Sequence, residues 1–96
     1  MQRENEREAE NRKLLCDVLA IVVKEHREKL GKSMHILSAE GSVNKASWVL
    51  LEGKKVKFPS LIVLWKIAKV LDIKPSELIK EVEDKLGDKF SLSGLD

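Results

Sequence analysis

The apolar residues of this chain recur every three or four positions, and alternation of apolar and polar residues never lasts more than a few positions. A spacing of three and four places side chains on one face of an α-helix, whereas a half-buried strand requires alternation. The clearest stripe comprises Leu14, Leu15, Val18, Leu19, Val22 and Val23. The sequence therefore predicts an all-α fold.

Capping residues divide the chain into five predicted helices. The first contains the apolar stripe, extends back through the charged residues 3–13 and stops at Gly31. Residues favoured at helix starts follow it, namely Ser33, Asn44, Ser60 and Pro75. We expect the later helices at about 34–40, 45–53, 61–72 and 75–86, with Leu61, Leu64, Ile67, Ala68 and Leu71 on one face of the fourth. The predicted domain organisation is a charged helical extension (1–13), one folded domain (14–86) and a C-terminal tail (87–96).

Composition limits the class of protein. The chain has 96 residues, enough for one domain with its own core. Its apolar fraction of 43 % and charged fraction of 35 % are typical of a globular protein. Its longest apolar run is far shorter than the roughly 20 residues of a membrane-spanning helix. Because its single cysteine, Cys16, cannot form an internal disulfide, we expect a cytoplasmic protein without a membrane partner.

Residues suited to catalysis or metal binding are few. His26 and His35 are nine positions apart and Cys16 lies far upstream, which matches no zinc-ligand spacing. No grouping of Ser, His and Asp, or of Cys and His, indicates a nucleophile with its base. The sequence therefore predicts no enzyme, no metal site and no cofactor.

Charge is distributed unevenly along the chain. Residues 44–72 contain six lysines against two acids, Glu52 and Asp72, whereas residues 73–96 contain four lysines against six acids. A basic middle beside an acidic end favours a surface that meets a polyanion. A solvated lysine-rich loop is the alternative, and charge alone does not separate the two.

Two short predicted helices, separated by about four residues, form a possible helix-turn-helix. Further residues strengthen this interpretation: Arg27, Ser33, Leu37, Val43-Asn44-Lys45, Leu51-Glu52, Pro59-Ser60-Leu61, Ile67-Ala68-Lys69-Val70-Leu71 and Pro75-Ser76-Glu77-Leu78-Ile79. Through them, residues 19–79 resemble the lambda-repressor/Cro (XRE) helix-turn-helix family. The resemblance implies a five-helix lambda-repressor-like bundle, here with an extended N-terminal helix. It also implies a sequence-specific regulator of transcription, repressor-like, that binds double-stranded DNA.

The resemblance assigns roles to individual residues. Arg27, late in the first helix, would form a structural ion pair with Glu52 at the end of the recognition helix, which covers about 44–53 and would lie in the major groove. DNA contacts are implied for Ser33 and Met34, for Asn44, Lys45, Ala46, Ser47, Val49 and Leu50, and for Lys54, Lys55 and Lys57 in the following loop. Lysines suit phosphate contacts because each neutralised phosphate releases counterions.

Three positions depart from the family pattern. Met34 stands where many members have a glutamine that binds the DNA backbone. Gly41 stands where a core side chain is usual and would leave a hole. Trp48 replaces a smaller apolar residue of the recognition helix, so we expect its ring in the core, filling that space, rather than stacked on a base.

Val49 and Leu50 give the reading face few hydrogen-bonding groups. Either DNA is read through methyl contacts and shape, or this face binds a protein. The alternative function is therefore a protein-interaction module, such as an antitoxin-like adaptor with a degenerate helix-turn-helix, which would use Val49, Leu50 and Trp48 as its binding patch. The basic loop favours DNA.

Members of the family act as two-fold dimers on palindromic DNA, so the resemblance implies a homodimer in the cytoplasm, associated with the nucleoid. One candidate interface is the apolar stripe of the last helix and the tail, comprising Ile79, Val82, Leu86, Phe90 and Leu92. The other is the long first helix, whose N-terminal extension has no role inside a compact domain. The C-terminal stripe is the favoured interface.

Overall fold

A computed structural model of the chain describes residues 6–41, 43–54 and 60–87. These ranges contain five helices and no strand. The helices are α1 (Glu6–Leu30), α2 (Met34–Gly41), α3 (Lys45–Glu52), α4 (Leu61–Val70) and α5 (Pro75–Leu86). The predicted all-α class is confirmed, and each helix lies within a few residues of its predicted bounds.

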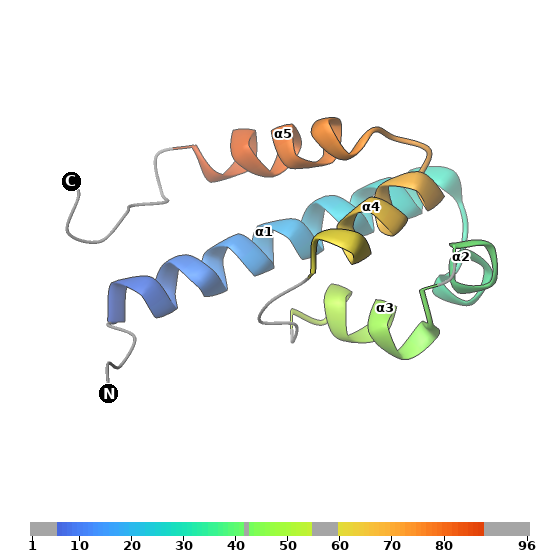
Figure 1. Ribbon diagram of the computed structural model, residues 1–96, viewed down its shortest axis with the longest axis horizontal. Helices are drawn as coiled ribbons and strands as arrows, with labels where there is room; N and C mark the ends of the chain where they lie inside the picture. Colours follow the sequence, from blue (N-terminus) through green and yellow to red (C-terminus); the bar gives the residue numbers. More distant parts are fainter. Residues whose placement is uncertain (1–5, 42, 55–59, 88–96) are drawn as a thin grey trace.

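The longest helix, α1, forms the spine of the bundle, with α5 alongside it (Figure 1). Helix α3 packs against α1 and α2, while α4 packs against α2 and α5. All five helices contribute to one core, which contains Val18, Leu19, Val22, Val23, Leu37, Val43, Trp48, Leu51, Ile67, Ala68, Leu71, Leu78, Val82 and Leu86. Among the described residues, this core is aliphatic apart from one tryptophan, which agrees with the few aromatic residues in the sequence. No helix in the described ranges has the length and apolar character needed to cross a bilayer.

The end of α1 fixes where the chain turns towards α2. Gly31 has a positive φ of 69°, a conformation that glycine adopts without steric penalty. Its N–H donates to the carbonyl of Glu28, and the N–H of Lys32 donates to the carbonyl of Arg27. These bonds satisfy two of the last four carbonyls of the helix, which ends just before the predicted glycine.

Helix α5 is held against α1 by both apolar and polar contacts. Val82 and Leu86 are 4 % and 8 % exposed and belong to the core. His26 Nε2 lies 2.6 Å from Glu81 Oε2 along the same contact. The predicted C-terminal dimer stripe is therefore wrong for Val82 and Leu86, because packing inside the chain already covers them. Of that stripe Ile79 is exposed, while Phe90 and Leu92 lie outside the described residues.

The expectation of a hole at Gly41 is also wrong. A methyl group of Val70 from α4 occupies the place where a β-carbon of residue 41 would lie. The glycine therefore allows α2 and α4 to approach closely. Trp48 is in the core, with 0 % exposure, as expected, but Val70 fills the position beside Gly41.

Helix α4 buries a narrower face than its sequence suggests. Ile67 and Ala68 are 0 % exposed, and Leu71, just after the helix, is 2 % exposed. Leu61 was expected on the same face, yet it is 68 % exposed. It lies about two turns before Ala68, in the first turn of the helix.

Candidate nucleic-acid interface

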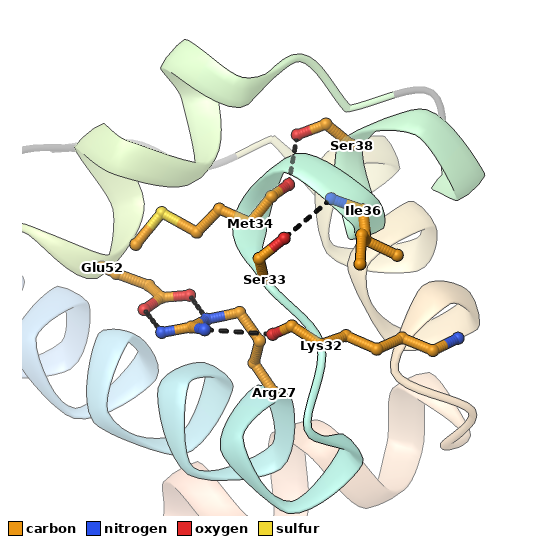
Figure 2. A network of polar contacts seen from close by, with 7 residues as sticks. All are labelled: Arg27, Lys32, Ser33, Met34, Ile36, Ser38 and Glu52. Atoms are coloured by element: carbon orange, nitrogen blue, oxygen red, sulfur yellow. Dashed lines mark hydrogen bonds and ion pairs between the residues drawn. The ribbon is translucent and has the colours of Figure 1, made fainter.

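A bidentate ion pair joins α1 to α3 (Figure 2). Arg27 Nε donates to Glu52 Oε2 at 2.6 Å, and Arg27 Nη2 donates to Glu52 Oε1 at 3.0 Å. The side chains are only 15 % and 3 % exposed. The hydrogen bond to Glu52 raises the pKa of Arg27 more than burial lowers it, so the guanidinium remains charged. The pair that the resemblance implied therefore lies at the base of α3.

The same guanidinium also fixes the segment that leads into α2. Arg27 Nη1 donates to the backbone carbonyl of Lys32 at 3.1 Å. One side chain thus connects the end of α1, the start of α2 and the last turn of α3 (Figure 2). Since two of its donors are committed to a carboxylate in planar geometry, lysine could not replace this arginine. The arrangement holds α2 and α3 in a defined relation to α1.

Side-chain caps begin both short helices. The Ser33 hydroxyl oxygen accepts a hydrogen bond from the N–H of Ile36 at 3.2 Å, ahead of α2. Asn44 Oδ1 accepts one from the N–H of Ser47 at 2.8 Å, ahead of α3. Helices of this length need such caps because few of their backbone groups find partners inside the helix.

The face of α3 that points away from the core is basic and aliphatic. Val49 is 49 % exposed and Leu50 is 46 % exposed, and Lys45 and Ala46 are also exposed. Trp48 and Leu51 lie on the opposite face, in the core. Burial of that pair determines which side of the helix faces solvent.

Burial of Glu52 changes the electrostatics of this face. Glu52 is the only acidic residue of α3, and its carboxylate is paired with Arg27 beneath the helix. Lys45 in the first turn and Lys54, two residues beyond the last, are exposed cations. The exposed side of α3 therefore combines positive charge with aliphatic groups and presents no free carboxylate.

The residues predicted to contact DNA do not all lie in comparable environments. Ser33, Asn44, Lys45, Ala46, Val49, Leu50 and Lys54 are exposed. Met34 is half-buried and packs on the core. Ser47 is also half-buried, and its backbone N–H donates a hydrogen bond to Asn44. Lys55 and Lys57 lie outside the described residues. Met34 therefore contributes to core packing, which the sequence comparison with a surface glutamine did not suggest.

Sequence reasoning missed Ile36. Its side chain is 45 % exposed on α2, next to the fully buried Leu37. In a helix of two turns, periodicity does not determine which of two adjacent apolar residues faces the core. The sequence therefore offered no local signal that Ile36 rather than Leu37 would be exposed.

Neither comparison with known proteins nor a search for metal-binding clusters assigns a function to the chain. No family model, curated protein or solved structure matches the chain. In the described ranges, no three His, Cys, Asp or Glu side chains gather closely enough to bind a metal ion. The function of the exposed side of α3 is therefore inferred from its geometry and charge.

Proposed function

We propose that the chain is a sequence-specific regulator of transcription, of the lambda-repressor/Cro class and repressor-like, that binds double-stranded DNA with α3 as its recognition helix. The observation that supports this best is the exposed side of α3, which presents lysine and aliphatic groups while its only carboxylate is paired beneath it with Arg27. DNA attracts cations through its phosphates and repels free carboxylates.

The arrangement of α2 and α3 supports the same proposal. The two helices pack against each other, and they are not parallel: α2 is seen nearly end-on in Figure 1, while α3 lies across the view. A helix-turn-helix uses this arrangement to let the first helix cross the DNA backbone while the second enters the major groove. The Arg27–Glu52 pair would keep this relation fixed on binding.

The side chains of α3 suggest how the groove would be read. Lys45 would donate to guanine O6 and N7, or to a phosphate, and Lys54 would contact the backbone. Between them, Ala46, Val49 and Leu50 would make apolar contacts, for which thymine methyl groups are the natural partners in the major groove. Such a regulator would act in the cytoplasm, on the nucleoid, as a two-fold dimer that places two recognition helices one DNA turn apart.

Fluorescence anisotropy with a labelled generic duplex tests the proposal. Between about 50 and 200 mM salt, the logarithm of the affinity should fall linearly with the logarithm of the salt concentration. Lys54→Ala should reduce that slope by about one, because the phosphate contact proposed for Lys54 is lost. Lys85→Ala removes the same charge from α5 and serves as the matched control, with no change of slope expected. The proposal fails if no binding occurs at the lowest salt, or if both variants change the slope equally.

A protein-interaction module is the second candidate, favoured by the exposure of Val49 and Leu50 at 49 % and 46 %. Its patch cannot include Trp48, which was expected there but is fully buried. Docking of a protein onto aliphatic groups would depend little on salt. Backbone NMR shifts at 33–36 and 44–54 that appear with a protein partner, and not with duplex DNA, would favour this function over DNA binding.

A further inference from the structure

The first turns of α4 carry the three most exposed large apolar side chains of the described residues. Leu61 is 68 % exposed, Ile62 is 65 % exposed and Trp65 is 55 % exposed. Because residues three and four positions apart are neighbours on a helix, Trp65 lies beside both of the others. Ile79 on α5, 48 % exposed, continues this surface. Monomeric proteins rarely leave an apolar patch of this kind in water. We call these four residues the α4–α5 patch.

A shallow groove lies within the patch, between α4 and α5. Trp65, Pro75 and Ile79 supply its apolar lining, and Lys74, Lys80 and Glu83 stand at its edge. Leu61 and Ile62 project beside it, at the exposed start of α4. One surface thus contains both a projecting apolar pair and an apolar hollow. A two-fold axis through such a surface would bring the projecting pair of each copy to the hollow of the other.

The charges around the groove have both signs. Lys74 and Lys80 are basic, and Glu83 is acidic. Lys74 and Glu83 have no ion-pair partner in the described part of the chain, whereas Lys80 is paired with Asp84 at 3.2 Å. A strongly acidic or strongly basic partner would meet like charges along part of this rim. A second copy of the same surface, turned by a two-fold rotation, can place each sign opposite the other.

We propose that the α4–α5 patch is the surface through which two copies of this chain form a two-fold dimer, with Leu61 and Ile62 of each copy entering the groove of the other. The proposal deepens the dimer of the proposed function and replaces the C-terminal stripe as its interface. The α4–α5 patch lies on α4 and α5, and the candidate DNA face lies on α2 and α3, so dimerisation would leave the DNA face accessible. Its observations do not depend on DNA binding, and its test uses no DNA.

The two tryptophans make the test direct. Trp48 is 0 % exposed and Trp65 is 55 % exposed, so an aqueous quencher of fluorescence reaches Trp65. Sedimentation equilibrium and iodide quenching are measured on the full chain from about 1 μM to about 1 mM, a range that covers weak and moderate association. We expect the mass to rise from one chain to two, and quenching of Trp65 to fall in parallel as the interface covers it.

Two variants locate the interface. Ile62→Glu should keep the protein monomeric, with unchanged quenching over the whole range, because a carboxylate would enter the groove of the other copy. Leu15→Glu is the matched control: it puts the same charge on an exposed apolar residue of α1, 40 % exposed, and should leave dimerisation intact. Far-ultraviolet circular dichroism checks that both variants are folded. A mass of one chain throughout, or a dimer that Ile62→Glu does not weaken, would overturn the proposal. If the protein stays monomeric, the α4–α5 patch binds a partner other than a second copy. A failure to bind DNA would contradict the proposed function but not the proposed dimer, because sedimentation is measured without DNA.

Discussion

Replacing Arg27 by methionine would remove the guanidinium that connects α1, α3 and the start of α2, while keeping an unbranched apolar stem of similar length. Three hydrogen bonds are lost: two to the Glu52 carboxylate, at 2.6 and 3.0 Å, and one to the carbonyl of Lys32, at 3.1 Å. Glu52 remains in place with its side chain 3 % exposed, so water cannot replace both donors without local opening. The cost is therefore that of a buried carboxylate left without its partner.

That cost is about 3–5 kcal/mol when one member of a buried pair is removed, against about 1 kcal/mol or less for an exposed pair. Since Arg27 is itself 15 % exposed, partial hydration of the site places the expected loss near the lower limit, about 3 kcal/mol. In a domain of this size each kcal/mol lowers Tm by about 4–8 °C, so the variant should melt at least about 12 °C lower.

Titration of Arg27 should leave this loss of stability unchanged near neutral pH. The pKa of Arg27 is raised in the folded state by its hydrogen bond to Glu52. A raised pKa contributes stability that is fully present below the unfolded-state value and is lost only as the pH rises through the folded-state value. Both values are strongly alkaline, so titration of Arg27 should not change the destabilisation between roughly pH 6 and 9.

Urea unfolding followed by circular dichroism measures the effect in a double-mutant cycle of Arg27→Met and Glu52→Gln. The coupling between the two should be at least about 1.5 kcal/mol, because the double variant no longer buries an unpaired charge. Lys80→Met breaks the exposed Lys80–Asp84 pair, whose side chains are 72 % and 62 % exposed, and should cost no more than about 0.5 kcal/mol. Additive single losses, or an Arg27→Met loss no larger than that of Lys80→Met, would refute the reasoning.

Three further predictions concern packing, capping and burial. Gly41→Ala should destabilise the domain by about 1–3 kcal/mol in urea unfolding, because its new methyl group would overlap Val70; a neutral effect, or a loss that Val70→Ala does not reduce, would contradict this. Asn44→Ala should cost about 1 kcal/mol through the lost cap on Ser47, and Asn44→Asp much less; equal losses would show that the cap is not the cause. Burial, and secondarily the Asp17 carboxylate, raise the pKa of Cys16, so its thiol should react with a disulfide reagent far more slowly in the folded protein than in urea; equal rates would place Cys16 at the surface.

Most of the fold could be predicted from sequence signals that act between residues close together in the chain. The period of three and four residues, the caps Asn44 and Ser60 and the glycine at 31 depend on near neighbours in the chain, so the helix bounds could be predicted closely. Whether an individual apolar side chain is buried or exposed depends on whether another helix covers it. Leu61 and Leu86 are both apolar residues in helical stripes, yet one is 68 % exposed and the other 8 %. No local rule distinguishes them.

The candidate site shows the same division. The sequence determined that α3 would carry lysine and aliphatic residues, because these are read directly from positions 45–54. The resemblance implied the pairing of Glu52 with Arg27, and Trp48 was expected in the core, whereas only the tertiary structure decided that Met34 packs on the core and that Gly41 accommodates Val70. Local propensity acts through bonds within one turn, whereas burial and pairing arise when segments distant in the chain, such as residues 27 and 52, are brought together by a shared core.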